Sequence, residues 1–249
     1  MRQKFSSNGI ILLCLIGIFS LTACTKTINN PIINPNINAD SSQSCIDACY
    51  VDTFHYETPK LYLFKGSQYV RCDILTNKYE DINAISKGYP GVPFTEIDAS
   101  YVDTWHYPTP KLYLFRGNQY VRYDILTNTY EDINTIVKGY PNVPFSTIDA
   151  AYVDTWHYST PKLYLFKGSQ YVRYDILTNT YEDINTIAKG YPGVPFTTID
   201  ASYVDTWHFS TPKLYLFKGS QYVRYDILTN KYEDINTISK GYPGVPFCK

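Results

Sequence analysis

The sequence repeats itself every 51 residues from Ile46 to its final residue, Lys249. Each copy begins with the triplet Ile-Asp-Ala, and the four units are 46–96, 97–147, 148–198 and 199–249. Self-similarity at a period of about 20–50 residues is typical of repeat architectures, in which each unit buries its apolar face against its neighbours. The folded part of the chain, residues 45–249, is therefore expected to be one array of four similar units.

The third unit illustrates the strands that the repeat predicts. Residues 148–154, 162–167 and 170–175 are rich in Val, Ile, Leu, Tyr and Phe, as strands are. The last two segments are separated only by Gly168-Ser169, a dipeptide typical of a two-residue β-hairpin. These patterns predict a meander of short antiparallel strands.

The end of the unit predicts a fourth strand and one helical turn. An edge strand is expected near Tyr181, followed by Asp183 as the N-cap of a short helix. Ile184 and Ile187 would share one face of this helix, and Gly190 would be the C′ residue that ends it. One unit is therefore four short strands plus a helical turn.

Units of this kind predict the blades of a β-propeller. A four-stranded sheet of such short strands is not stable alone, and about 50 residues containing four strands is the size of one blade. Leucine-rich, ankyrin and tetratricopeptide repeats are shorter, and a kelch repeat would require a Gly-Gly pair that no unit contains. Four units then predict four blades around one axis.

The units also resemble the hemopexin repeat. Residues 97–145 have its Asp-Ala start, its Leu-Tyr-Leu-Phe strand followed by a basic residue and Gly, its Tyr-x-Arg-Tyr third strand and its closing Gly- and Pro-containing segment. The resemblance covers all four units and implies an all-β, four-bladed propeller whose blades each have four antiparallel strands and a short helical turn. The sequence departs from the family at Val70, Val121, Val172 and Val223, where the family often has Trp.

Four cysteines lie in the repeat region, and four cysteines allow three pairings. They are Cys45, Cys49, Cys72 and Cys248. The resemblance implies that Cys45 and Cys248 join the first and last blades. Cys49 and Cys72 are both substitutions found only in the first unit, which favours a second bond, although strands one and three of a flat meander are about 9.6 Å apart. The alternative is two free thiols.

The amino-terminal residues predict export. Arg2 and Lys4 precede an uncharged apolar run, as in a secretory signal peptide. Leu-Thr-Ala-Cys, ending at Cys24, resembles a bacterial lipobox, so residues 1–23 are predicted to be removed and Cys24 lipidated; an ordinary signal peptide is the alternative. Residues 24–44, rich in Asn, Pro and Ser, are predicted to be a flexible tether. The protein is expected at the bacterial outer membrane or cell surface, or alternatively secreted or periplasmic.

The hemopexin resemblance implies cations in the axial channel. Backbone carbonyls of the Asp that opens each unit would ring calcium or sodium, for which oxygen ligands are suited. These residues are Asp47, Asp98, Asp149 and Asp200. A second ion would lie at Cys49, Ser100, Ala151 and Ser202. The alternative is that the Asp carboxylates turn outward and bind neighbouring backbone.

One loop of every unit carries the other candidate binding residues. Each unit contributes one histidine, and a ring of these four side chains would be able to bind a transition metal or haem iron. They are His55, His106, His157 and His208. The alternative is that they are loop residues too far from the axis to converge. The preceding aromatic residues are expected to be exposed and to contact a ligand; they are Phe54, Trp105, Trp156 and Trp207.

Composition and symmetry narrow the function. Lys and Arg total 22 against 23 Asp and Glu, so the chain lacks the basic excess of a nucleic-acid-binding protein. Catalysis needs an asymmetric set of nucleophile, base and orienting group, whereas these units supply each polar residue in four copies. The sequence therefore predicts a monomeric, non-enzymatic module that binds a protein, a matrix component or glycan, or a host surface. Haem or metal binding is the alternative, and a hydrolase is disfavoured.

Overall fold

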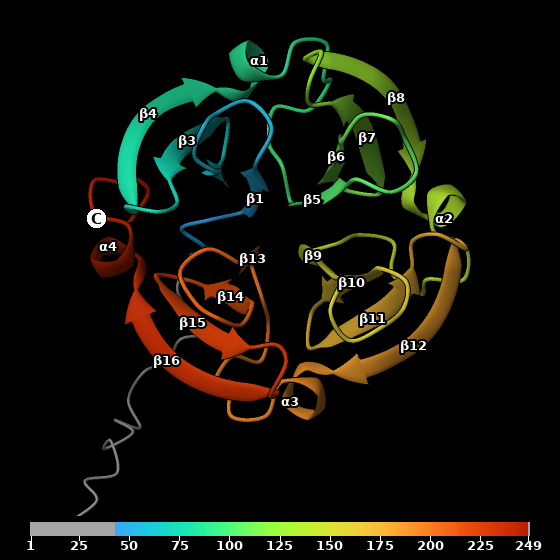
Figure 1. Cartoon of the computed structure of the whole chain (residues 1–249). Helices are drawn as coiled ribbons and strands as arrows, with labels where there is room; N and C mark the ends of the chain where they lie inside the picture. Colours follow the sequence, from blue (N-terminus) through green and yellow to red (C-terminus); the bar gives the residue numbers. More distant parts are fainter. Residues whose placement is uncertain (1–42, 249) are drawn as a thin grey trace, which may run out of the picture. The chain divides into compact units, whose positions relative to one another are not determined.

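Four antiparallel sheets surround a central axis in the computed structural model, which describes residues 43–248 (Figure 1). The first blade contains β1 (Ala48–Asp52), β2 (Lys60–Lys65), β3 (Gln68–Asp73), β4 (Lys78–Ala84) and α1 (Ile85–Gly88). The second contains β5 (Ala99–Asp103), β6 (Lys111–Arg116), β7 (Gln119–Asp124), β8 (Thr129–Thr135) and α2 (Ile136–Gly139). The third contains β9 (Ala150–Asp154), β10 (Lys162–Lys167), β11 (Gln170–Asp175), β12 (Thr180–Thr186) and α3 (Ile187–Gly190). The fourth contains β13 (Ala201–Asp205), β14 (Lys213–Lys218), β15 (Gln221–Asp226), β16 (Lys231–Thr237) and α4 (Ile238–Gly241).

The four-bladed propeller predicted from the sequence is confirmed. Within each sheet the strands pair in sequence order, and the first strands β1, β5, β9 and β13 contact one another around the axis (Figure 1). The predicted signal peptide, Cys24 and all but the last two residues of the predicted tether lie outside the described residues. Among those described, no helix is long and apolar enough to cross a membrane.

The hydrophobic cores lie between the blades. On β10, the side chains of Leu163 and Leu165 pack against the second blade, whereas those of Tyr164 and Phe166 pack against the fourth. Alternate residues of a strand point to opposite faces, so a strand buried on both faces is apolar at nearly every position. Most tyrosines of the chain are thereby buried, because the aromatic side of one blade packs against the Leu and Val side chains of the next.

The two-residue hairpin predicted at Gly168-Ser169 is present, since Lys167 pairs with Gln170 across it. Gly168 has a φ of +55°, a left-handed conformation that glycine adopts without a steric penalty. The same hairpin joins the second and third strands of the other blades.

The predicted position of the helical turn is wrong, because the fourth strand extends through the residues predicted to begin the helix. Asp183 and Ile184 lie inside β12, where Ile184 pairs with Val172, and the helix begins only at Ile187. The backbone ladder with β11 continues to Thr186 and supplies the hydrogen bonds that a helix at Asp183 would have lost. The Asp183 carboxylate instead accepts hydrogen bonds from the Ile184 amide and the Asn185 side chain.

Gly190 is also not the C′ residue, because it ends the helix itself and Tyr191 follows as the C-cap with a φ of −128°. The glycine is needed because an aromatic ring approaches it. A Cβ atom on Gly190 would lie 2.3 Å from Oη and 2.4 Å from Cε1 of Tyr171. The corresponding glycines of the other blades meet the equivalent tyrosines in the same way.

A disulfide joins the two ends of the ring. Cys45 and Cys248 are bonded with their Cα atoms 5.5 Å apart, and the Cys45 amide donates to the carbonyl of Gly219 in the last blade. The second predicted bond is wrong, because Cys49 and Cys72 are buried free thiols. Cys49 pairs with Leu63 and Cys72 with Leu61, so β2 lies between the two cysteines and their registers differ by two residues.

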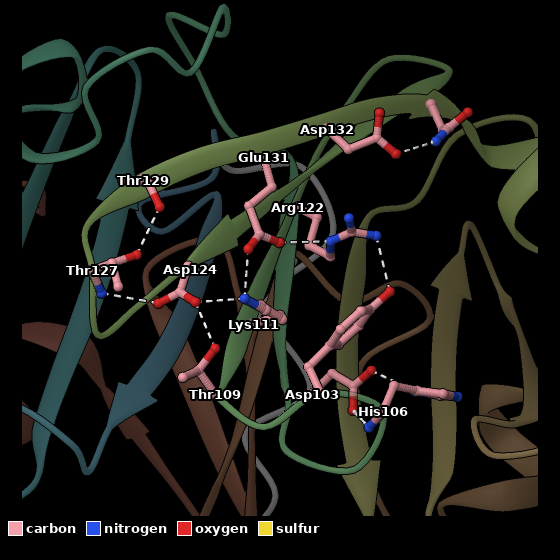
Figure 2. A network of polar contacts seen from close by, with 12 residues as sticks. Asp103, His106, Thr109, Lys111, Arg122, Asp124, Thr127, Thr129, Glu131 and Asp132 are labelled. Atoms are coloured by element: carbon pink, nitrogen blue, oxygen red, sulfur yellow. Dashed lines mark hydrogen bonds and ion pairs between the residues drawn. The ribbon is translucent and has the colours of Figure 1, made fainter.

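A buried ionic network holds together the outer three strands of each blade. In the second blade, Nζ of Lys111 on β6 is 2.5 Å from Oδ2 of Asp124 on β7 and 2.5 Å from Oε1 of Glu131 on β8 (Figure 2). The Thr109 hydroxyl also donates to Asp124. The equivalent Lys-Asp pairs are Lys60 with Asp73, Lys162 with Asp175 and Lys213 with Asp226.

The network lowers the pKa of its aspartate. Burial alone would raise the pKa of Asp124, but hydrogen bonds from Lys111, Thr109 and Thr127 outweigh it and hold this pKa well below its ordinary value of 3.8. A carboxyl group whose pKa is lowered by folding stabilises the fold above the unfolded-state pKa, and this contribution is lost as the pH falls below that value. The blades are therefore expected to lose stability below about pH 4.

We predict that Asp124→Asn lowers the free energy of unfolding by about 3 kcal/mol at pH 7, because it leaves the buried Lys111 ammonium with Glu131 as its remaining partner. Urea denaturation between pH 2 and pH 7 measures this, and the variant should also lose less stability than wild type below about pH 4. The control is Glu57→Gln, at an exposed loop residue. Equal losses in the two variants would contradict the role assigned to the network.

We also predict that Gly190→Ala destabilises the protein by about 2 kcal/mol, because the new Cβ forces the Tyr171 ring to move. Ala188→Ser, at an exposed position of the same helical turn, serves as the matched control and should change the stability by less than about 0.5 kcal/mol. Thermal unfolding of both variants measures the difference; a Gly190→Ala protein as stable as the control would show that the ring moves without cost.

Candidate functional site

The axial channel is lined by the second residue of each innermost strand. Cys49, Ser100, Ala151 and Ser202, with their flanking Tyr and Val residues, surround a cavity of about 120 Å³. The Ser100 hydroxyl donates to the carbonyl of Cys49, and that of Ser202 donates to the carbonyl of Ala151, each at 3.0 Å. Burial raises the pKa of the Cys49 thiol far above its usual range, although a backbone hydrogen bond with Ser202 opposes this. The thiol is therefore protonated and unreactive at neutral pH.

The four aspartates that open the repeats gather at one mouth of the propeller. They line a cavity of about 480 Å³ together with Lys65, Glu96 and Arg116. Each carboxylate binds the hairpin that follows β2 or its equivalent. Oδ2 of Asp149, for example, accepts a 2.8 Å hydrogen bond from the Gly168 amide, and Oδ1 accepts one from Lys167. Asp47, Asp98 and Asp200 are held in the same way.

The orientation of these four carboxylates bears on the predicted cation site in the channel. The carboxylates accept hydrogen bonds from backbone amides and basic side chains, and the main-chain carbonyls are the oxygen ligands that the predicted calcium or sodium site would use. Among residues 43–248, no group of three or more His, Cys, Asp or Glu side chains is placed to hold a metal ion. Cation binding by the carbonyls of the channel stays a prediction.

The four histidines do not converge on one metal site among the described residues. Each lies in the loop that leads outward from the innermost strand, and its Nδ1 donates to the Asp three residues earlier at 2.6–2.7 Å. Figure 2 shows this pair for Asp103 and His106. The same carboxylates accept the backbone amides of Phe54, Trp105, Trp156 and Trp207. Each imidazole is therefore held by its own loop, and among residues 43–248 no three of these side chains are grouped to hold one metal ion.

The predicted contact aromatics are partly exposed. Phe54, Trp105, Trp156 and Trp207 have exposed fractions of 36–37%. The turns after the third strands expose Leu75, Leu126, Leu177 and Leu228 by 43–45%. In an antiparallel blade the first and third connections emerge at the same end, and Nε2 of His208 lies 3.1 Å from the carbonyl of Leu75 in the next blade. We call these eight side chains the aromatic face.

Pockets open between neighbouring blades beside these loops. The pocket between the third and fourth blades has a volume of about 170 Å³ and is lined by His157, Tyr158 and Arg173 from one blade and by Tyr225 and Asn230 from the next. Equivalent pockets of about 170 Å³ and 320 Å³ lie between the first and second and between the second and third blades. We call these three cavities the inter-blade pockets.

Two residues of these pockets are not among the site residues predicted from the sequence. Arg173 and Tyr225 both belong to the Tyr-Val-Arg-Tyr motif of the third strand, which was interpreted only as a strand and a family resemblance. A charged residue within a strand that is otherwise buried was the available signal, because such residues are rarely buried without a partner. The sequence does not show that the Tyr of one blade lines the same pocket as the Arg of the preceding blade.

Comparisons with known proteins agree with the architecture. No protein-family model matches the chain. Human matrix metalloproteinase-21 is 31% identical over 180 residues, which is 65% of this chain but only 30% of the length of that protein. The solved hemopexin fold protein CP4 from cow pea has a TM-score of 0.66 and 28% identity, covering 81% of this chain and 96% of its own.

A plant lectin with two metal binding sites from Cicer arietinum has the same architecture at 24% identity, with a TM-score of 0.64 and a coverage of 80% of this chain and 95% of its own. At this identity the likeness concerns the fold alone. The four sheets, their order and these neighbours together show that the chain is a four-bladed β-propeller of the hemopexin fold.

Proposed function

We propose that this protein is a non-enzymatic binding module that acts outside the cytoplasm and docks a protein or a glycan-bearing surface through its aromatic face. The observation that carries this proposal is the fourfold display of Phe54 or Trp beside an exposed Leu at one end of the propeller. Trp and other aromatic side chains are enriched among the residues that dominate binding energies at interfaces. Four similar contacts on a rigid ring suit a repetitive or extended partner.

Export is supported by the disulfide between Cys45 and Cys248, because such bonds form and persist in oxidising compartments. Similarity to a matrix metalloproteinase agrees with an extracytoplasmic location. We retain lipidation of Cys24 and attachment to a bacterial outer membrane or cell surface as part of the proposal.

The geometry favours surface binding over the haem alternative. A fourfold haem or metal site would require imidazoles that converge, whereas no three His, Cys, Asp or Glu side chains among residues 43–248 are grouped to hold a metal ion. The polar groups of each loop likewise bind one another and support the exposed aromatic side chain above them. We infer that these loop hydrogen bonds hold the exposed aromatic residues in position to contact a partner.

We predict that the triple variant Trp105→Ala, Trp156→Ala and Trp207→Ala loses at least about tenfold in affinity on an array of matrix proteins and glycans, because it removes the largest side chains of the aromatic face. The control is Val137→Ser, which changes a residue of α2 that is 73% exposed and lies outside the aromatic face. Far-UV circular dichroism verifies that the triple variant is folded. If wild type binds nothing on the array, the proposed function is wrong; if the triple variant binds as wild type does, another surface mediates binding.

A further inference from the structure

Three tyrosine hydroxyls are buried without a hydrogen-bond partner. Tyr123, Tyr174 and Tyr225 are each 1% exposed, and their Oη atoms have no partner among the described residues. An unsatisfied buried polar group costs about 1–3 kcal/mol, so each one in a native structure calls for an explanation. Each of these tyrosines lines one of the three inter-blade pockets.

A histidine from the preceding blade lines every one of these pockets. His157 donates through Nδ1 to Asp154, which fixes the ring and leaves Nε2 without a partner among residues 43–248. His55 and His106 are held in the same way in the other two pockets. Two hydrogen-bonding groups from different blades therefore line each cavity.

The rim of the pocket is aromatic, its guanidinium is paired within the blade, and the Asp154 carboxylate accepts three hydrogen bonds from its own loop. Arg173 lies over the Tyr158 ring, 5.0 Å from its centroid, and donates to its hydroxyl at 3.0 Å. Its Nε donates to Glu182 at 2.7 Å, so the guanidinium charge is neutralised within the blade. Burial raises the pKa of Tyr225 to about 12, so its hydroxyl stays protonated and able to donate at neutral pH. These features suit a neutral ligand with several hydroxyl groups.

The interface between the fourth and first blades lacks the same features. Cys72 stands where the other blades have the unpartnered tyrosine, and Phe209 stands where they have Tyr56, Tyr107 or Tyr158. Nε2 of His208 is engaged by the carbonyl of Leu75. All three differences fall on one interface, although they come from two blades. Loss of the hydroxyl, the rim tyrosine and the free imidazole nitrogen together is the change expected where a site has lost its ligand.

We propose that the three inter-blade pockets are binding sites, each of which takes one pyranose ring of a neutral glycan, and that the fourth interface is not a site. This inference rests on the proposed binding function and assigns it a ligand class. Two of the cavities measure about 170 Å³ and the third about 320 Å³, at or below the low end of the about 300–1,000 Å³ typical of drug-sized sites, and this size suits a single sugar ring. The sugar would lie against the rim tyrosine and share hydroxyls with the buried tyrosine and the imidazole. Because the tyrosine hydroxyl is shielded from solvent, entry requires rotation of the rim residue, which at Tyr158 is 38% exposed.

The test removes only the unpartnered hydroxyls. In the triple variant Tyr123→Phe, Tyr174→Phe and Tyr225→Phe, each pocket keeps its shape and its ring packing but loses one hydrogen bond to ligand. Methyl glucoside, methyl galactoside, methyl mannoside and methyl N-acetylglucosaminide are screened by saturation-transfer NMR, and calorimetry of the best binder measures affinity and stoichiometry. We expect three sites in wild type and about three- to tenfold weaker binding in the variant, with thermal stability unchanged or raised.

The matched control is Tyr130→Phe, Tyr181→Phe and Tyr232→Phe, which removes three tyrosine hydroxyls on the fourth strands, outside the pockets. It should bind as wild type does. The inference is overturned if no glycoside gives a signal, if the stoichiometry differs from three, or if the pocket variant binds as tightly as the control. A wild-type protein that binds the matrix and glycan array through its aromatic face but fails these tests would refute the pockets while leaving the proposed function intact.

Discussion

Packing of the aromatic side of one blade on the aliphatic side of the next is the interaction on which the rest of this structure depends. No blade has a core of its own, because the apolar residues of its second strand point alternately to its two neighbours. Rings from successive blades meet edge to face, as Tyr191 and Tyr225 do with centroids 5.5 Å apart. Such ring pairs lie at three of the four interfaces. At the fourth, Cys72 replaces the tyrosine, and the disulfide between Cys45 and Cys248 covalently joins the last blade to the first.

Within each blade, polar groups hold the strands together, as the aromatic rings hold neighbouring blades together. The Lys-Asp-Glu network ties three strands together, and the loop Asp binds its own His and backbone. Burying these charges is tolerated only because every partner is present, which explains why the network recurs unchanged in all four copies. The positions that depart from fourfold symmetry are therefore the informative ones. Cys72, Phe209 and the engaged His208 all mark the same interface.

Local chemistry explains which parts of this structure were predictable. The hairpin at Gly168-Ser169 follows from glycine's tolerance of positive φ, and the blade count follows from the period. The predicted start of the helix was wrong because Asp183 is compatible both with an N-cap and with a strand position. The hydrogen-bonded pairing with β11 places it in the strand. Gly190 is predicted from the sequence as the residue that ends the helix, whereas the structure shows that it is required because the Tyr171 ring on another strand leaves no room for a Cβ atom.

The sequence by itself determined the four-bladed propeller and the loops that carry His and Trp, because these depend on a period and on residue types that act locally. The bond between Cys45 and Cys248 was implied by the family resemblance, and the structure shows it. Only the tertiary structure decided that Cys49 and Cys72 stay unbonded on either side of β2, that the imidazoles fold onto their own loops, and that Tyr225 lines the pocket it shares with the preceding blade. These outcomes depend on where a side chain of one element lies relative to another element. The repeat pattern predicts the strands and turns within each blade, but it does not show which side chains of the next blade pack against them.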